Sequence, residues 1–296
     1  MDASGSASCP LCGAPSAAAF RTVDRNRHVS DAVFEYRRCS GCGAVFLHNV
    51  PADLARYYDS GYHRAPAPSQ LDTWSAYESY KLDLLRSLAP SGRVIDIGSS
   101  YGAFVYLATR AGYDAAAIEV DAGACTFIQD VIGAPAVQSA APEEALLTVD
   151  RADVITMWHS IEHVTQPWRV VAAAAERLSP GGRLVVSTPN PDGIQARWLK
   201  GRFMHVDAPR HLFLIPRRAL IARAQAAGLA PGPMTAADVE TKRCNRVGWQ
   251  SSLHELSPGI PGAWGAGLVL ETVIRPIERG VDHGSAYTAV FTRPAG

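Results

Sequence analysis

The sequence lacks a net charge, because its 28 basic and 28 acidic side chains cancel. Without a long-range basic field to gather nucleic acid, RNA or DNA is disfavoured as the substrate. The chain also lacks an apolar run of 18 or more residues, so we expect no membrane-spanning helix and no membrane partner. The first residues, Met1 to Ser8, show no apolar segment like that of a signal peptide. We therefore expect a cytosolic protein.

Cysteine is scarce, and four of the six cysteines form two Cys-x-x-Cys pairs, Cys9/Cys12 and Cys39/Cys42. In a reducing compartment such pairs favour a tetrahedral zinc site over disulfide bonds. Residues 13–38 separate the pairs, which is longer than the common spacer of about 15–20 residues. The spacer still fits a hairpin with strands at 19–23 and 33–38. We predict a structural zinc ribbon over residues 1–50, whose closed four-sulfur site leaves no position for a substrate.

After a linker and entry helices at 51–92, strand patterns alternate with helix patterns. This alternation predicts an α/β fold whose parallel sheet is covered on both faces, with ligands beyond the carboxyl ends of the strands. We expect a core at 93–240, a helical cap at 241–285 and a final strand within 286–296. The expected strands are 93–98, 114–119, 135–138, 152–158, 183–188, 234–239 and 286–292, and the expected helices are 102–111, 121–131, 143–149, 167–178 and 216–227.

The stretch from Arg93 to Gly102, Arg-Val-Ile-Asp-Ile-Gly-Ser-Ser-Tyr-Gly, joins a short apolar strand to the start of a helix. Glycines at 98 and 102 permit a tight turn, and a helix N-terminus offers unpaired N–H groups. Glu119 ends the next strand, near the offset of about 20 residues at which a carboxylate reaches ribose hydroxyls. These features predict a nucleotide-binding corner. A dinucleotide fingerprint would require further glycines at 100 and 103, where Ser and Ala stand.

The pattern Asp96-x-Gly98-x-x-x-Gly102 resembles the first motif of class I S-adenosylmethionine-dependent methyltransferases. The resemblance implies a Rossmann-like doubly wound sheet of seven strands, the last one antiparallel, with S-adenosylmethionine as the cofactor. It implies that the turn holds the methionine part of the cofactor, that Asp96 lies behind the turn and that Glu119 binds the ribose. The cofactor contacts that we expect are Asp96, Gly98, Ser100, Tyr101, Gly102, Glu119, Ala141 (at the adenine) and Trp158.

A second cluster, His159-Ser-Ile-Glu162-His163, follows the apolar strand 152–158. The string matches a His-x-x-Glu-His zinc-peptidase motif, but that motif needs a long helix and Pro167 follows too closely. His-x-x-Glu-His-Val is also common at this junction in the methyltransferase family. Related ubiquinone-pathway O-methyltransferases have Glu in place of His159 and hold a divalent cation there, and hard cations prefer oxygen ligands. We expect His163 as a general base, His159 as a second catalytic candidate and Glu162 on the substrate side. For each histidine the alternative is a structural hydrogen bond to the loop backbone.

A third cluster, Asp207-Ala-Pro-Arg210-His211-Leu, resembles the Asp-x-Pro-Arg-His-Leu segment of many bacterial small-molecule methyltransferases. The resemblance implies a catalytic role for His211 and substrate contacts for His205, Asp207 and Arg210. The alternative for Arg210 is a surface ion pair with Asp207.

The sequence as a whole predicts methyl transfer to a small molecule in natural-product biosynthesis or in a sugar or cofactor pathway, with oxygen favoured over carbon or nitrogen as the acceptor atom. In-line displacement would be assisted by a histidine base. One alternative is an RNA methyltransferase that binds RNA through arginines of the zinc ribbon. Another is a non-catalytic, zinc-stabilised binding protein. The sequence leaves the oligomeric state open.

Overall fold

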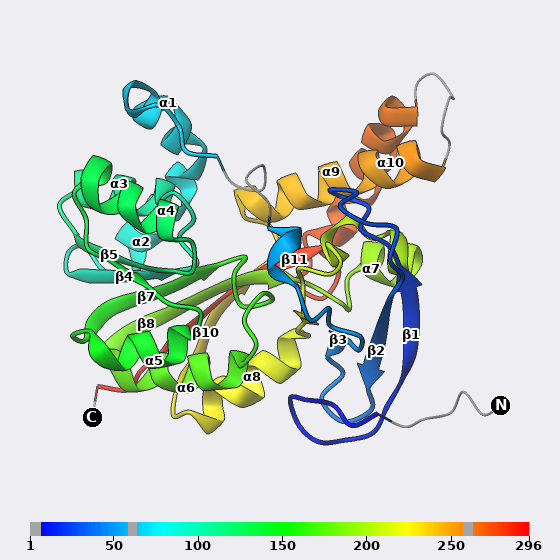
Figure 1. The fold of residues 1–296 in the computed structure, drawn as a ribbon, viewed down its shortest axis with the longest axis horizontal. Coiled ribbons are helices and arrows are strands. Elements are labelled where there is room, and N and C mark those ends of the chain that lie inside the picture. The colour runs from blue at the N-terminus through cyan, green and yellow to red at the C-terminus, as the bar shows by residue number, and fades with distance from the viewer. Residues whose placement is uncertain (1–6, 59–63, 257–262, 296) are drawn as a thin grey trace. The chain divides into compact units, whose positions relative to one another are not determined.

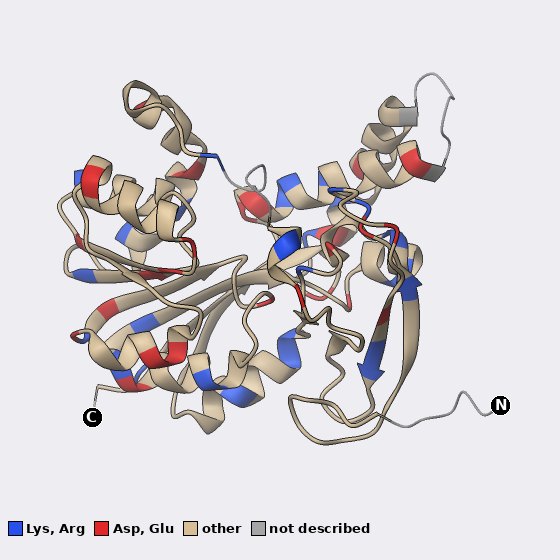
Figure 2. Cartoon of the chain, in the orientation of Figure 1, with Lys and Arg blue, Asp and Glu red and all other residues tan. Residues whose placement is uncertain are grey.

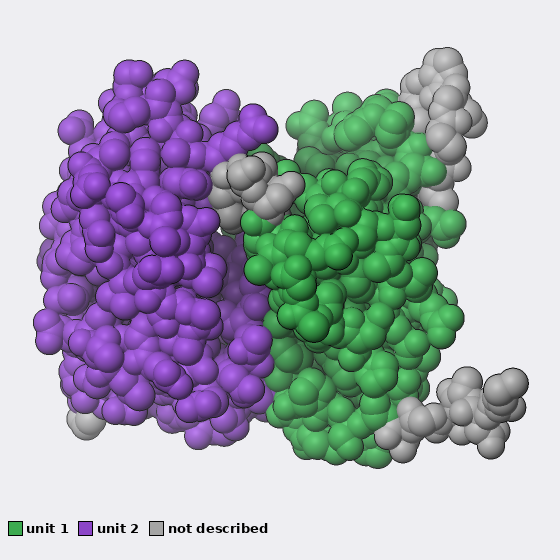
Figure 3. All heavy atoms as spheres, viewed as in Figure 1, with its two compact units in different colours: residues 1–59, 188–221, 234–288 green, residues 60–187, 222–233, 289–296 purple. Residues whose placement is uncertain are grey.

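The computed structural model describes residues 7–58, 64–256 and 263–295. It consists of two compact units that interleave along the chain (Figure 3). Unit 1 comprises residues 1–59, 188–221 and 234–288, and unit 2 comprises residues 60–187, 222–233 and 289–296. No helix among the described residues is long and apolar enough to cross a membrane.

A seven-stranded sheet forms the centre of unit 2, in the order β10-β11-β8-β7-β4-β5-β6 (Figure 1). The central strand β4 pairs in parallel with β5 on one side and β7 on the other. The last strand, β11, is antiparallel. This topology confirms the predicted Rossmann-like fold. The strands are β4 (Arg93–Ile97), β5 (Asp114–Glu119), β6 (Ala136–Gln138), β7 (Ala152–Trp158), β8 (Leu178–Pro189), β10 (Ala230–Thr235) and β11 (Ala286–Thr292).

Helices follow most of these strands, as the alternating pattern predicts. Local signals start them: Pro167 stands at the first turn of α6, and the Asp121 carboxylate caps α4 by accepting the Ala124 N–H at 2.7 Å. Val94, Val105 and Val154 pack with other buried side chains in one core. The helices that accompany the sheet are α1 (Leu71–Ser75), α2 (Ser79–Leu88), α3 (Ala103–Arg110), α4 (Ala122–Phe127), α5 (Pro142–Thr148), α6 (Pro167–Arg177) and α8 (Arg217–Ala226).

One strand lies away from its predicted position. The sequence predicts a strand at 234–239, whereas β10 spans Ala230–Thr235. Prolines at 231 and 233 argue against a strand there, because proline cannot donate to the ladder. The strand order places β10 at the end of the sheet. An edge strand has one side without a partner strand, so prolines are tolerated in it.

Unit 1 contains a second sheet of four strands, in the order β1-β2-β3-β9. All neighbouring pairs in this sheet are antiparallel. The predicted hairpin corresponds to β1 (Ser16–Thr22) and β2 (Phe34–Cys39), whereas β3 (Val45–Leu47) and β9 (Phe213–Leu214) have no counterpart in the prediction. Of the segment 241–285, the described residues 241–256 and 263–278 are helical, as expected, whereas residues 257–262 lie outside the described residues. The role of this segment as a cap stays a prediction, as do the functional domain limits. The α-helices wholly within unit 1 are α7 (Ile194–Leu199), α9 (Val239–Leu256) and α10 (Ala263–Glu278).

Candidate functional site

The turn after β4 takes a backbone conformation that its sequence requires. Gly98, Ser100 and Gly102 all have a positive φ, at 75°, 49° and 77°. A Cβ atom on Gly98 would lie 2.5 Å from the Ser160 Cβ, and one on Gly102 would lie 2.8 Å from the Ile128 Cγ1. Both positions therefore need glycine for its backbone freedom and for its small size. Gly102 also precedes α3 without a side-chain cap, so the first N–H groups of that helix face outward from its end.

Glu119 ends β5 with its carboxylate against this turn. One carboxylate oxygen, Oε2, accepts the Ser100 N–H at 2.7 Å. The other, Oε1, accepts the N–H groups of Val120 and Asp121 at 2.8 and 3.0 Å. Because β4 and β5 are parallel neighbours, their carboxyl ends lie at the same edge of the sheet. The structure thus brings the predicted ribose-binding carboxylate and the predicted cofactor turn together.

Asp96 is buried behind the turn, next to β7. The Thr156 hydroxyl donates to the Asp96 Oδ1 at 2.6 Å, and the Ser99 hydroxyl donates to the Asp96 carbonyl at 2.8 Å. Burial raises the pKa of Asp96 to about 6, although the hydrogen bond from Thr156 acts in the opposite direction. The sequence analysis did not predict Thr156 as a partner of Asp96. The signal for it is a polar residue within the apolar strand 152–158.

Three further predicted cofactor residues lie at the same edge of the sheet or in its loops. Trp158 ends β7, and among the described residues its buried indole Nε1 has no hydrogen-bond partner. The ring of Tyr101, in the turn, meets the ring of Phe127 edge to face at 5.5 Å. Ala141 precedes α5 in the loop after β6, where the Ser139 N–H donates to the Glu119 carbonyl at 2.9 Å. The structure therefore places the predicted cofactor contacts around one corner.

The histidine cluster forms a turn rather than a helix, so the helical scaffold of a zinc peptidase is missing from residues 159–163. His159 has a positive φ of 51° and is held by its neighbours. Its Nε2 lies 3.2 Å from the Ser187 Oγ, and its Nδ1 lies 3.4 Å from the Oε1 of buried Glu162. Both ring nitrogens of His159 are thus engaged within unit 2, and the catalytic roles of His159 and His163 stay predictions.

Arg210 is completely buried in unit 1 and forms ion pairs with two carboxylates. Its Nη2 lies 2.6 Å from the Asp24 Oδ1 and 2.7 Å from the Asp207 Oδ1. Its Nε donates to the Asp207 Oδ2, and its Nη1 donates to the Asp24 Oδ2 and the Tyr57 carbonyl. The alternative of an ion pair with Asp207 is therefore present, but in the interior and not on the surface. We call Asp24, Asp207 and Arg210 the ion cluster.

The ion cluster fixes the segment that carries two predicted site histidines. The His211 Nδ1 lies 2.8 Å from the His205 carbonyl, and the His205 Nε2 lies 3.1 Å from the Cys244 carbonyl. A carbonyl only accepts, so Nδ1 of His211 carries the proton and Nε2 is the basic nitrogen of the neutral ring. Since all five N–H donors of Arg210 are used, the structure supports a positioning role for it. Substrate contact by His205, Asp207 and Arg210 stays a prediction.

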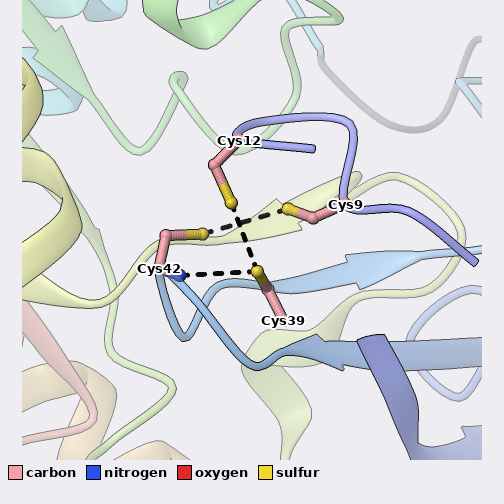
Figure 4. Close-up of side chains that lie close together, drawn as sticks. All are labelled: Cys9, Cys12, Cys39 and Cys42. Atoms are coloured by element: carbon pink, nitrogen blue, oxygen red, sulfur yellow. Dashed lines mark hydrogen bonds between the residues drawn. The ribbon is translucent and has the colours of Figure 1, made fainter. Parts of the chain in front are cut away.

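The four predicted zinc ligands converge in unit 1 (Figure 4). The sulfur of Cys9 lies 3.9 Å from that of Cys42, the sulfur of Cys12 lies 3.3 Å from that of Cys39, and all four lie within 4.8 Å of one another. Burial raises the pKa of Cys39, but hydrogen bonds from the Cys42 N–H, the Cys12 thiol and the Gly41 N–H outweigh burial and lower the pKa to about 6. The group can hold one tetrahedral metal ion.

The sequence model of the methyltransferase-domain family matches residues 70–231, more than half of the chain. The chain belongs to this family. The match includes β4, the glycine turn, Glu119 and the histidine turn, which are the features that the sequence resemblance rests on. The predicted site residues of this methyltransferase-family chain divide between its two units.

Individual relatives match over part of their length. A 37.1 kDa uncharacterized protein of transposon Tn4556 from Streptomyces fradiae is 31% identical over 167 residues, which cover 51% of this chain and 43% of that protein. A ubiquinone biosynthesis O-methyltransferase from Ralstonia nicotianae is 26% identical over 151 residues, which cover 49% of this chain and 63% of the relative. The chain thus spans about half the length of these curated relatives. Among solved structures, the (4+2)-cyclase SpnF has a TM-score of 0.50 and 16% identity, over 74% of this chain and 82% of that chain, which supports the fold alone.

Proposed function

We propose that this protein transfers the methyl group of S-adenosylmethionine to a small molecule, with oxygen as the favoured acceptor atom. The observation that carries the proposal is the Glu119 carboxylate, held 2.7 Å from the Ser100 nitrogen beside the uncapped N-terminus of α3. A carboxylate at this place suits ribose hydroxyls. Membership of the methyltransferase-domain family supports the reaction class, and the Ralstonia O-methyltransferase supports oxygen as the acceptor.

The residues present fit the cofactor. The turn 98–102 would hold the methionine part, Glu119 the ribose, and the loop at Ala141 the adenine. The indole N–H of Trp158 is a buried donor that lacks a partner among the described residues, and a bound ligand would satisfy it. When bound, the cofactor supplies an electrophilic methyl group on its sulfonium.

The protein's own contribution is to align the acceptor, exclude water and take up a proton. Alignment and desolvation lower the barrier because the sulfonium methyl needs little further activation. In our proposal the imidazole of His163 accepts the proton that the acceptor hydroxyl releases during the attack. His211 is the second candidate, since its hydrogen bond to the His205 carbonyl leaves Nε2 as the basic nitrogen.

The four cysteines would hold a structural zinc ion. In a tetrahedral site with Zn–S bonds of about 2.3 Å, the sulfurs lie roughly 3.8 Å apart. The observed separations of 3.3 and 3.9 Å bracket that value. Four thiolates fill the coordination sphere, so this zinc would stabilise the small sheet of unit 1 and would not activate a substrate.

The charge pattern of the ribbon does not favour RNA as the substrate. Figure 2 shows basic and acidic residues interspersed. Arg21 pairs with Glu35 at 3.3 Å, Arg25 pairs with Glu255 at 3.0 Å, and Arg38 pairs with Asp192 at 3.1 Å. Arginines neutralised in this way release few counterions from a phosphate backbone.

Titration calorimetry with S-adenosylmethionine and with its demethylated product tests the proposal. We expect one binding site per chain. Glu119→Gln should weaken binding by tenfold or more, because a hydrogen bond to a charged group contributes about 1.5–3 kcal/mol. Glu176→Gln, at an exposed site on α6, is the matched control and should bind normally. Absence of nucleoside binding in the wild-type protein would instead support the non-catalytic alternative.

A further inference from the structure

We propose that unit 1 carries a second ligand site, which binds an anion with a hydrocarbon body, such as an acyl carboxylate or an alkyl phosphate. The site is a cavity of about 690 Å³ whose lining residues all belong to unit 1. That volume is within the range of about 300–1,000 Å³ that is typical of small-molecule sites. Its lining comes from residues 15–20 along the edge strand β1, from residues in or next to β2, β3 and β9, and from residues of α7 and the short helical turns after it.

The floor of the cavity is a row of residues set by the strand register, and it is apolar apart from Arg38. Ala17 pairs with Arg38, Arg38 with Val45, and Val45 with Leu214, so these four residues form one row across β1, β2, β3 and β9. Residues paired directly across strands point to the same face of a sheet. All four line the cavity, with buried Phe203 beside them. Small and aliphatic side chains dominate this row, and they suit a hydrocarbon chain.

The charge on the lining is positive. Asp192 is the only carboxylate among the lining residues. It forms an ion pair with Arg38, whose Nη1 lies 3.1 Å from the Asp192 Oδ1. Arg197, in the last turn of α7, and Lys200 are exposed lining residues, and the described part of the chain gives neither of them an ion pair. Two unneutralised cations beside an apolar floor favour a ligand with an anionic group at one end.

The backbone of Lys200 supports a role for its side chain. Its φ of 50° and ψ of −118° lie outside the regions that L-residues favour, and such a conformation costs about 1–3 kcal/mol. The strand β1 holds the turn in place, because the Thr22 hydroxyl donates to the Gly201 carbonyl at 2.6 Å. A glycine at position 200 would be less strained. A lysine in this conformation therefore places a cation beside the cavity at the expense of stability.

Calorimetry on the whole 296-residue chain, without cofactor, tests the site with octyl phosphate and octanoate as probes. We expect each protein chain to bind one octyl anion at least tenfold more tightly than inorganic phosphate or octylamine. Inorganic phosphate lacks the hydrocarbon chain and octylamine lacks the negative charge, and we expect binding to need both. The tighter of the two octyl probes identifies the anion. Equal affinity for octylamine, or no binding of either octyl anion, would overturn the proposal.

Two pairs of variants locate the binding. Arg197→Glu should weaken octyl-anion binding about tenfold, whereas Arg110→Glu, in the last turn of α3, makes the same charge change outside the cavity and should not. Ala196→Leu fills space in the cavity and should reduce binding, whereas Ala222→Leu on exposed α8 surface should leave it unchanged. Equal effects within either pair would contradict the assignment.

Lys200→Gly separates a ligand-binding role from a structural one. We expect a higher melting temperature, because the strain is relieved, together with about tenfold weaker octyl-anion binding. A stabilised variant with unchanged affinity would remove Lys200 from the site. Binding of the demethylated cofactor product, measured in the same variants, should not change. Loss of octyl-anion binding with intact nucleoside binding therefore bears on this site alone, and the reverse result bears on the proposed methyl transfer.

Discussion

Replacing Arg210 with methionine tests whether the ion cluster holds unit 1 together. Methionine keeps much of the side-chain volume but leaves the carboxylates of Asp24 and Asp207, whose side chains are 0% and 11% exposed, without their cation. Removing one partner of a buried ion pair costs about 3–5 kcal/mol, because the remaining charge has lost its solvation and its partner. We expect a loss of that size in the free energy of unfolding at pH 7.

The pH dependence of this loss gives the sharper test. Burial raises the pKa of Asp207, but its hydrogen bond with Arg210 and the nearby positive charges outweigh burial and lower the pKa from 3.8 to about 2. Asp207 therefore contributes about 2 kcal/mol of stability above pH 4, and this contribution is lost as the pH falls through 2. In the variant, Asp207 lacks the cation that lowers its pKa, so it takes up a proton more readily as the pH falls. The difference between the two proteins should thus narrow below pH 4.

Urea unfolding followed by near-ultraviolet circular dichroism, at pH 7 and pH 3, measures both effects. Arg197→Met removes an exposed arginine and should change stability by less than about 0.5 kcal/mol. The triple variant with Asp24→Asn, Asp207→Asn and Arg210→Met removes all three charges and should recover part of the loss. A loss below about 1 kcal/mol at pH 7, or a loss that does not depend on pH, would refute the assignment of a buried, charged cluster.

Three further predictions concern unit 2 and the metal. The pKa of Asp96 is about 6 in the folded state against a usual 3.8, so the folded state binds more protons than the unfolded state between these values. Stability should therefore fall by about 2 kcal/mol as the pH rises from 4 to 6, and Asp96→Asn should abolish that slope in urea titrations. Metal analysis should find one zinc per chain, and Cys12→Ser or a chelator should release it and lower the urea midpoint. His163→Ala should reduce the rate at which the demethylated cofactor forms, with a panel of hydroxylated acceptors, by about 10²–10⁴-fold. Calorimetric binding of the demethylated cofactor should stay unchanged, and unchanged turnover would exclude His163 as the general base.

The sheet of unit 2 could be predicted because its strands are short apolar runs between turn signals. The stretches 114–119, 152–158 and 286–292 coincide with β5, β7 and β11. The strands β3, β9 and β10 could not be predicted so well. β9 has only two residues, Phe213 and Leu214, and exists because the β3 edge offers hydrogen-bond partners, which no local pattern encodes. β10 contains prolines that only its edge position permits.

The same distinction applies to the candidate site. The meeting of Glu119 with Ser100 follows from adjacent parallel strands, and strand order in this family is regular enough to foresee it. Asp24 could not be foreseen as the partner of Arg210, because nothing near residue 24 marks it and the two residues are far apart in the sequence. Such an ion pair depends on which segments of the folded chain lie next to the ribbon, and neither composition nor local sequence patterns predict that.

The predicted ribbon is also joined to a segment that lies far along the chain. A free-standing zinc ribbon would end near residue 50, but here β3 pairs with β9, the Tyr36 hydroxyl donates to the His211 carbonyl at 2.8 Å, and Asp24 binds Arg210. The ribbon is thus bonded to the segment 205–214, which carries the predicted substrate-side residues. Because a closed four-sulfur zinc would rigidify β1 and β2, its effect would extend through these bonds to His211. In the function proposed above, the zinc would then act on catalysis by positioning His211 and not through chemistry of its own.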